Sequence, residues 1–508
     1  MQQEIAIALI GAGIALFNGW PASARAASVE PEGVRKRPPS IARLDSDGML
    51  IVVGRRTFVF GCYWNPATSQ GLDMLKQAGF NLVSAKADRR ALDEVASHGL
   101  LAWIPLGERI APSNDADAKR LEATVTPLLD HRALVAWEIP DEALWNEWYE
   151  RQGKLEAERV RLRELMKERG KTGADVSGLR QLMSEEAVLR ARADFAAAEA
   201  RERDIRKILG APPQDPNIQL STASASAEQH RLRLLRGYRA LHKLDTRPVW
   251  MNFAPRNTLG DIHSYAEAAD IVGCDIYPVP VTPQQGHSDL ANRQLSCVGD
   301  YAERFHWAGG NRAVWMVLQG FGWGDLNKPA ADAPKDTGRR PTCAESRFML
   351  YDAIVHRARG VLYWGCNYAQ EPPDFWNELC AVVREAANHG EIWAARDAKV
   401  QPVVSYEPTW GSVDRPPVAL AKFLDGKTCI LVVNEHTDGL AVRLTGLGHL
   451  DNAKISLVGD ADGCALTGDR IVQGSLTIHM PALSAALVTV ATGNEKWQGR
   501  QGVKTQRR

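Results

Sequence analysis

Three acidic residues follow directly on one apolar run in the first third of the chain. The run is ALVAW (133–137), and Glu138, Asp141 and Glu142 come immediately after it. Two carboxyl groups held close together can divide acid–base work, because one keeps a proton while the other stays ionised. A carboxylate can also act as a nucleophile. This segment is therefore the first candidate for a catalytic site.

Polar and aromatic side chains also follow later apolar runs. An indole can stack on the C–H face of a sugar ring, and a pair of carboxyl groups supplies the acid and the nucleophile or base that glycoside hydrolysis needs. The combination predicts a carbohydrate site at the ends of these runs. The candidates, beside the acidic residues above, are Asp275, Tyr277, Gln319, Trp323 and Trp364.

Other tryptophans lie inside the apolar runs rather than at their ends. Trp137, Trp250 and Trp315 are each surrounded by aliphatic neighbours in the sequence. Packing inside the protein is the more common use of a tryptophan in that setting. We therefore expect these three to pack in the layers of side chains inside a barrel, and Trp323 and Trp364 to stack on a sugar.

Eight short β-like runs recur between helical stretches over residues 40–400. Strands that alternate with helices indicate parallel βα units, and eight of them predict an α/β fold of the (β/α)8 TIM-barrel type. In such barrels the active site lies at the carboxyl ends of the strands, where the candidates above fall. The runs span 58–64, 81–87, 100–106, 133–139, 247–253, 270–278, 313–319 and 360–365.

Two segments fall outside this alternation. Residues 143–209 are dense in Glu, Arg, Leu and Ala around a break at 170–178, which predicts an inserted hairpin of two long helices. We expect a solvated hairpin held by ion pairs; contact with a partner protein, or service as a lid, is the alternative. Residues 401–494 instead show short alternating runs, which predict a C-terminal antiparallel β-sandwich.

The N-terminal residues 1–27 have the layout of a signal peptide. A 13-residue apolar run from Ile5 to Phe17 precedes small residues that end in ARA (24–26), although Glu4 and no lysine or arginine stands before the run. We expect a secreted or periplasmic protein whose mature part has no membrane span, because no other stretch is long and apolar enough.

Composition narrows the partners further. Lysine plus arginine and aspartate plus glutamate number 61 each, so the chain lacks the basic excess that binding to nucleic acid requires. Neither a CxxC motif nor clustered cysteine and histidine points to zinc, and no nucleotide motif is present. We therefore expect no cofactor, no metal and a carbohydrate as the partner.

Two of the strand-end segments resemble clan A glycoside hydrolases, the mannanase- and cellulase-like barrels. AWEIPDE (136–142) resembles their AWEL-x-NE motif at strand four, which implies that Glu142 is the general acid and puts Asp141 in place of the sugar-binding asparagine. DIVGCDIYP (270–278) resembles the strand-six pattern DxVSxHxYP, with Asp275 in place of histidine and Tyr277 at the tyrosine position. The resemblance covers the barrel without the insertion.

One departure from this family bears on the chemistry. The clan has a nucleophilic glutamate at the end of strand seven, where VLQGFG (317–322) has Gln319. A neutral amide cannot form a glycosyl ester, so Asp275 is the expected nucleophile or base, with Glu138, Asp141, Tyr277 and Gln319 around the sugar. Cleavage of O-glycosidic bonds in a poly- or oligosaccharide is the expected function; the alternative is a non-catalytic carbohydrate-binding protein on a degenerate barrel.

Overall fold

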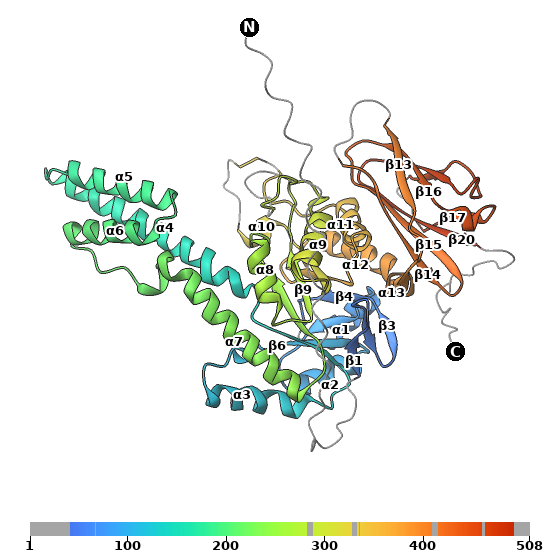
Figure 1. Cartoon of the computed structure of the whole chain (residues 1–508), viewed down its shortest axis with the longest axis horizontal. Coiled ribbons are helices and arrows are strands. Elements are labelled where there is room, and N and C mark those ends of the chain that lie inside the picture. The colour runs from blue at the N-terminus through green and yellow to red at the C-terminus, as the bar shows by residue number, and fades with distance from the viewer. Residues whose placement is uncertain are drawn as a thin grey trace, which may run out of the picture. The chain divides into compact units, whose positions relative to one another are not determined.

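A closed barrel of eight parallel strands forms the centre of the protein (Figure 1). The computed structural model describes residues 41–66, 68–281, 288–327, 333–334, 336–408, 415–459 and 463–491. The expected signal peptide, 1–27, lies outside the described residues. Among the helices that are described, none has the length and apolar character needed to cross a bilayer.

All eight predicted runs form barrel strands, so the predicted fold class is confirmed. Strands of a parallel barrel are covered on both faces, which explains why the runs are almost continuously apolar. The barrel closes where β10 pairs with β11 and β11 with β4. In barrel order the strands are β4 (Val59–Cys62), β5 (Leu82–Ser84), β6 (Leu101–Pro105), β7 (Leu134–Glu138), β8 (Val249–Phe253), β9 (Ile271–Asp275), β10 (Ala313–Gln319) and β11 (Gly360–Trp364).

Large side chains fill the barrel interior, and a small sheet closes its amino-terminal end. Trp103, Trp250 and Trp315 are fully buried in one apolar cluster, whereas Trp137 belongs to the cluster outside the barrel. The sheet of β1 (Ala42–Leu44), β2 (Leu50–Val52) and β3 (Arg55–Thr57) adds its own apolar residues to the interior cluster. This sheet therefore covers the amino-terminal end of the barrel.

The helices between the strands bury one face against the barrel. Sequence signals mark their starts: Thr68 accepts a hydrogen bond from the amide of Gly71 at the start of α1, and Thr342 and Glu345 form a capping box on α11. These helices are α1 (Ser69–Gln77), α2 (Arg89–Ser97), α3 (Asp115–Val125), α7 (Ala223–Leu244), α8 (Leu259–Ala266), α9 (Cys297–Ala308), α10 (Trp323–Leu326), α11 (Cys343–Val355), α12 (Asp374–Ala387) and α13 (Gly390–Ala394).

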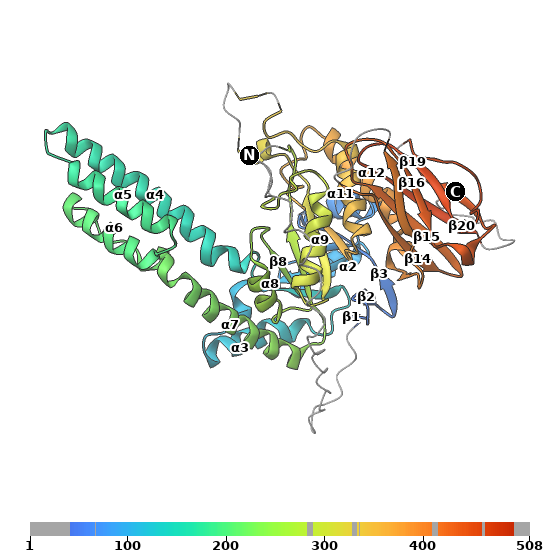
Figure 2. The same ribbon diagram turned by 45° about the horizontal axis from the view of Figure 1, so that its top comes forward.

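The insertion after β7 contains three helices rather than the expected pair. They are α4 (Ala143–Lys171), α5 (Ser177–Ala191) and α6 (Phe195–Leu209), and both views draw them side by side (Figures 1 and 2). The predicted second arm is divided because Ala193 adopts a left-handed φ of 59° and Asp194 caps α6. The three helices share a small core of Leu162, Leu179 and Ile205.

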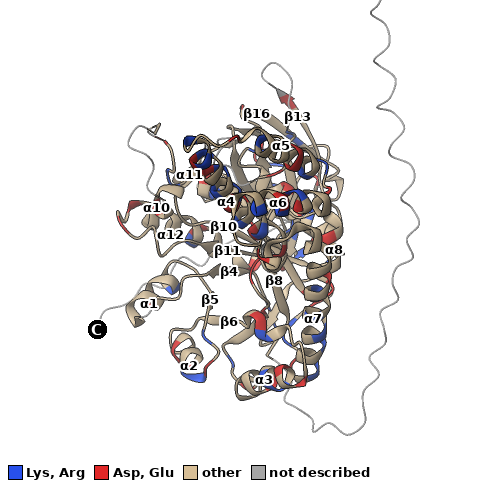
Figure 3. Ribbon diagram, turned by 90° about the vertical axis from the view of Figure 1, so that its left-hand side faces the viewer, with Lys and Arg blue, Asp and Glu red and all other residues tan. Residues whose placement is uncertain are grey.

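Charged residues cover much of this insertion, with both signs interspersed (Figure 3). Several pairs are shielded from water: Arg206 binds Glu202 at 2.7 Å, and Arg190 binds Glu186 at 2.5 Å. Such charge-assisted pairs hold the helices in register where the apolar core is small.

The C-terminal domain is the predicted sandwich of two antiparallel sheets. One sheet has the order β12-β14-β15-β20-β17 and the other β13-β16-β19-β18. Alternate residues of the facing strands, such as Val432, Val442 and Ile478, form the core between them. The strands are β12 (Arg396–Asp397), β13 (Val403–Pro408), β14 (Val418–Leu424), β15 (Lys427–Asn434), β16 (Leu440–Thr445), β17 (Lys454–Val458), β18 (Ala465–Leu466), β19 (Leu476–Met480) and β20 (Ser484–Ala491).

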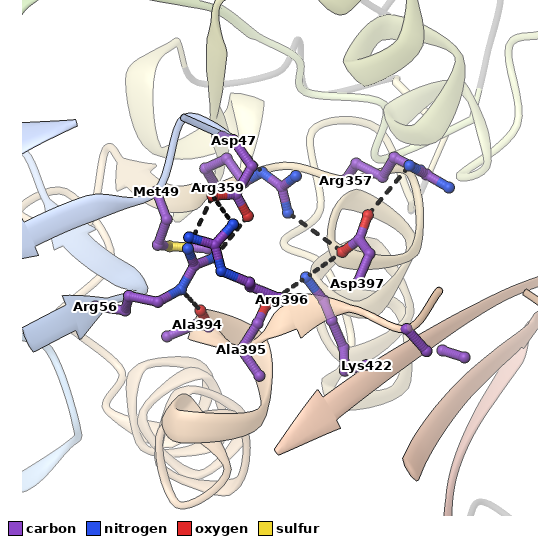
Figure 4. A network of polar contacts seen from close by, with 12 residues as sticks. Asp47, Met49, Arg56, Arg357, Arg359, Ala394, Ala395, Arg396, Asp397 and Lys422 are labelled. Atoms are coloured by element: carbon purple, nitrogen blue, oxygen red, sulfur yellow. Dashed lines mark hydrogen bonds and ion pairs between the residues drawn. The ribbon is translucent and has the colours of Figure 1, made fainter. Parts of the chain in front are cut away.

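The described residues from 41 to 491 belong to one compact unit, and a polar network connects the sandwich to the barrel (Figure 4). Arg56 of β3 binds Asp47 at 2.7 Å, and Arg359 donates to the Asp47 carbonyl at 3.1 Å. The buried Lys422 of β14 binds Asp397 at 2.8 Å, while burial lowers the pKa of Lys422 to about 8. The network therefore joins the first sheet, the barrel and the sandwich.

Candidate active site

Glu138, at the end of β7, is buried and fully engaged in hydrogen bonds. Its carboxylate accepts from the indoles of Trp103 at 2.8 Å and Trp250 at 3.0 Å, and from the Tyr63 hydroxyl at 3.0 Å. Burial, and then the charge of Asp141, raise its pKa to about 8, although the three donors act in the opposite direction. Glu138 is therefore a structural acceptor beneath the rim and is not accessible to a substrate.

Asn252 brings two further carboxyl groups together. This residue belongs to β8, and its amide nitrogen donates to Asp141 at 2.9 Å and lies 3.5 Å from Asp275. Asp141 reaches solvent, but protein atoms crowd around it and raise its pKa. Asn252 thus links the end of β7 to the end of β9.

Glu142 has a backbone conformation that is rare for its residue type. Its φ is 47°, in the left-handed region, and its amide donates to the Asn252 carbonyl at 3.2 Å. A non-glycine residue in this region costs free energy, and such strain gathers at functional sites. Burial and the charge of Asp141 raise the pKa of Glu142 to about 7, so its carboxyl group can take up a proton close to neutral pH.

Asp275 is hydrogen-bonded to Glu142. Burial, followed by the charges of Glu142 and Asp141, raises the pKa of Asp275 well above its usual range. Asp275 is therefore the protonated partner and donates the hydrogen bond to Glu142. Hydrogen-bonded oxygens lie about 2.5–3 Å apart, whereas retaining glycosidases separate their carboxyl groups by about 5–5.5 Å and inverting ones by about 6.5–9.5 Å. In this conformation the pair has neither spacing.

An aromatic cluster lies beside these carboxyl groups. The rings of Tyr277 and Trp364 stack at 5.8 Å between centroids, and burial raises the pKa of Tyr277 well above its usual range. Phe321 packs edge-on against Trp364 and Trp323, at 5.1 and 5.2 Å. Trp364 and Trp323 are only partly buried, so parts of their rings are open to a ligand.

The side chain of Gln319 forms hydrogen bonds with the backbone rather than with the carboxyl groups and rings described above. The side chain is completely buried, and its amide donates to the carbonyls of Val279 at 2.7 Å and Phe321 at 3.1 Å. Its oxygen accepts from the amide of Val279 at 2.9 Å. The amide therefore holds the backbone that follows β9, and none of its polar atoms is directed at a substrate.

Sequence reasoning missed three residues that support the site. Asn252, Tyr63 and Trp103 hold the carboxyl groups in place, yet none was among the candidates. A signal existed for Asn252, the one polar residue of VWMNF (249–253), and for Tyr63, which follows β4 at the same end of the barrel.

Metal-ligand geometry occurs elsewhere in the described part of the chain. The group whose ligand atoms all lie within 4.8 Å of one another is Asp352, His356 and Glu435. These residues belong to α11 and to the end of β15, not to the strand ends of the barrel.

Comparisons with known proteins add a likeness to glycoside hydrolase structures. No family model matches the chain, and no curated protein matches it. A GH42 beta-galactosidase from G. stearothermophilus is 9% identical over 85% of this chain and 98% of that chain, with a TM-score of 0.46. A GH30 endoxylanase from Clostridium papyrosolvens C71 is 10% identical over 86% and 96%, with a TM-score of 0.40.

A third similar structure is the beta-galactosidase from the psychrophilic Marinomonas ef1. It is 14% identical over 65% of this chain, with a TM-score of 0.39, and the chain spans 60% of its length. At such identities and scores, these likenesses give neither a substrate nor a reaction for this chain. The function has to follow from the residues of the chain itself.

Proposed function

We propose that the chain is a glycoside hydrolase that cleaves O-glycosidic bonds in a poly- or oligosaccharide. The supporting observation is Glu142, a carboxyl group at the active end of the barrel whose pKa is raised to about 7 beside a second carboxyl group, Asp275. A glycosidic oxygen is a poor leaving group, and an acid that keeps its proton near neutral pH can protonate it as the bond breaks.

Glu142 and Asp275 divide the reaction between them. Glu142 is the general acid, and Asp275 is the nucleophile or the base that activates a water molecule. Their mutual hydrogen bond belongs to the resting form, because a sugar between them needs a separation of about 5 Å or more. Substrate binding breaks this hydrogen bond, and the proton of Asp275 passes to Glu142, which leaves Asp275 ionised and Glu142 protonated.

The aromatic cluster supplies the sugar-binding surface. The partly open rings of Trp364 and Trp323 stack on the apolar face of a pyranose, while Asp141 accepts hydrogen bonds from its hydroxyl groups. Tyr277 stacks on Trp364 and extends this aromatic surface, and its hydroxyl group orients Asp275. Glu138 contributes indirectly, because it accepts hydrogen bonds from the indoles of Trp103 and Trp250 beneath the rim.

A panel of polysaccharides and aryl glycosides, assayed by the reducing ends released, tests this proposal. The wild type should release new reducing ends from at least one polysaccharide, and Glu142→Gln should release far fewer. Proton NMR of the first product then gives the anomeric configuration, which distinguishes nucleophilic attack by Asp275 from attack by water. A wild type that hydrolyses no member of the panel contradicts the proposal.

A specific observation favours a second candidate, a carbohydrate-binding protein without catalysis. By the sequence resemblance, Gln319 stands where the clan has its nucleophile, and its side-chain amide is hydrogen-bonded to the backbone of Val279. Binding without turnover, measured by calorimetry with the same polysaccharides, would support this candidate. Loss of binding in Trp364→Ala would then assign the ring to the sugar.

Export is part of the proposal, because a polysaccharide too large to cross a membrane has to be degraded outside the cytoplasm. Residues 1–27 act as the signal peptide, and the mature protein is secreted or periplasmic. Expression of the full chain, followed by N-terminal sequencing of the protein from the periplasm and medium, tests this. Recovery only from the cytoplasm, with the N-terminus intact, contradicts it.

A further inference from the structure

Three side chains with metal-binding chemistry converge where α11 meets the sandwich. Asp352 lies in the last turn of α11, His356 is the C-cap residue four positions later, and Glu435 follows β15. The Nε2 atom of His356 lies 2.7 Å from Oε1 of Glu435 and 3.8 Å from Oδ1 of Asp352. A cation bonded at about 2.0–2.2 Å keeps its ligand atoms roughly 3–3.5 Å apart, and these separations bracket that value.

Each of the three side chains is held through an atom that faces away from this point. The Nδ1 atom of His356 is hydrogen-bonded to Glu303 at 2.8 Å, and Oε2 of Glu435 accepts from Arg415 at 2.6 Å. The amide of Gly299 donates to Oδ2 of Asp352 at 2.7 Å. A carboxylate behind a histidine fixes the tautomer that presents Nε2 to a metal, so the surroundings already have the arrangement of a metal site.

Asp352 provides an independent sign that a ligand belongs here. Its side chain is completely buried, and its Oδ1 atom, 3.8 Å from Nε2 of His356, has no hydrogen-bond partner among the residues that the structure describes. A buried polar atom without a partner costs about 1–3 kcal/mol, and more when it is charged. A cation bound to Oδ1 would remove that cost.

The backbone at Gly299 leaves room only for a residue without a side chain. A Cβ atom there would lie 2.3 Å from Cδ2 of His356 and 2.6 Å from its Nε2. Glycine therefore permits the close approach of α9 that places its amide on Asp352.

We propose that Asp352 Oδ1, His356 Nε2 and Glu435 Oε1 bind one divalent transition-metal ion of the zinc class, independently of the hydrolytic site. One imidazole and two carboxylates suit Zn²⁺ better than Ca²⁺ or Mg²⁺, which prefer oxygen ligands alone. The ion joins barrel helix α11 to the sandwich strand β15 and is structural, since the barrel's rim carboxyls are on other elements. The competing arrangement is a purely ionic one, with a protonated His356 between Glu303 and Glu435.

The test uses the full mature chain, dialysed against a chelator and then titrated with Zn²⁺ or Co²⁺. One equivalent should bind, Co²⁺ should develop visible d–d absorption, and the melting temperature should rise with metal concentration. Asp352→Asn and His356→Gln should abolish stoichiometric binding. His230→Gln is the matched control, because His230 is equally buried between two carboxylates, Glu108 and Glu147, but belongs to no such triad.

A second variant keeps the test decisive if the ligand variants do not fold. Glu303 is largely exposed and lies behind His356, so Glu303→Gln should fold and weaken metal binding by about 10–100-fold. If the wild type binds no stoichiometric ion, or if Asp352→Asn and Glu303→Gln bind it as tightly as the wild type, the ionic arrangement is correct and the proposal is overturned.

Discussion

The Asp275 carboxyl group donates a hydrogen bond to Glu142 at the carboxyl end of the barrel. Two carboxyl groups in contact titrate as a pair, since ionisation of one disfavours ionisation of the other. The pair therefore holds a proton at a pH at which isolated carboxyl groups have lost theirs. This relationship is the basis of the first three predictions.

Glu142→Gln should lower turnover by about 10²–10⁴-fold on substrates with a poor leaving group, because proton donation is lost. A dinitrophenyl glycoside, whose leaving group departs without a proton, should be affected far less. Steady-state kinetics on both substrates measures the contrast. Equal small losses on both would exclude Glu142 as the acid.

Asp275→Asn should be severe on both substrates. A good leaving group does not compensate for the loss of a nucleophile or base, so turnover of the dinitrophenyl glycoside should fall as severely as that of the other substrate. Asparagine retains the size of the side chain and a hydrogen-bond donor toward Glu142, which limits structural damage. If Asp275→Asn turns over the dinitrophenyl glycoside as fast as the wild type does, Asp275 is neither the nucleophile nor the base.

Activity should be highest above about pH 7 and fall again at higher pH, because the reaction needs one proton on the pair. Glu142, whose pKa is raised to about 7, loses the first proton, and the raised pKa of Asp275 governs the loss of the last one. The charge of Asp141 contributes to both raised pKa values, so Asp141→Asn should lower both. The alkaline limb of the kcat/KM profile should then move to lower pH. A limb that stays in place or moves upward would show that another group controls it.

Glu138→Ala should destabilise the barrel by roughly 2 kcal/mol or more, because the buried indoles of Trp103 and Trp250 lose their shared acceptor. Urea unfolding at pH 6 measures the loss. Glu122→Ala, at an exposed glutamate of α3, is the control and should change stability by less than about 0.5 kcal/mol. A loss no larger than that of the control would contradict the structural role of Glu138.

The same residue should make stability depend on pH. Folding raises the pKa of Glu138 from 4.5 to about 8, so the folded protein binds this proton more tightly than the unfolded chain. The contribution is complete below about pH 4.5 and is lost progressively as the pH rises to 8. In Glu138→Ala, the decline of the unfolding free energy over this window should become shallower.

Most of the helical insertion should be dispensable for folding of the barrel. Its outer part has a core of its own, and Arg151 donates to the carbonyl of Gln219 at 3.0 Å, so the two ends lie close together. Replacement of residues 156–218 by a short Gly/Ser linker should leave one cooperative thermal transition. Replacement from residue 143 onward should cost more, because Tyr149 is bonded to the Arg256 carbonyl. Loss of cooperative unfolding in the shorter deletion would contradict this.

The sequence was sufficient for the barrel because each strand is a short apolar run buried on both faces, and such a run is visible without knowledge of its neighbours. It was not sufficient for the direction of side chains at the rim. Gln319 and Trp364 both end strands, yet one turns to the backbone of Val279 and the other stays partly open. The orientation of each of these side chains depends on contacts with segments that are distant in the chain.

Long-range grouping explains the other omissions. His356 and Glu435 are 79 residues apart, and Asn252 is 111 residues from Asp141. A local sequence pattern therefore predicts neither contact. The division of the second arm of the insertion was missed because Ala193 adopts a left-handed conformation unusual for alanine.

The pairing of β4 with β11 has a consequence for how the protein is made. Val59 pairs with Gly360, so the first barrel strand leaves the ribosome long before its partner has been synthesised. Until then, one edge of β4 exposes unpaired backbone groups, which are prone to pair with other chains. Closure of the barrel is therefore a late event, and high yields of the native protein should depend on chaperones that shield this edge during synthesis.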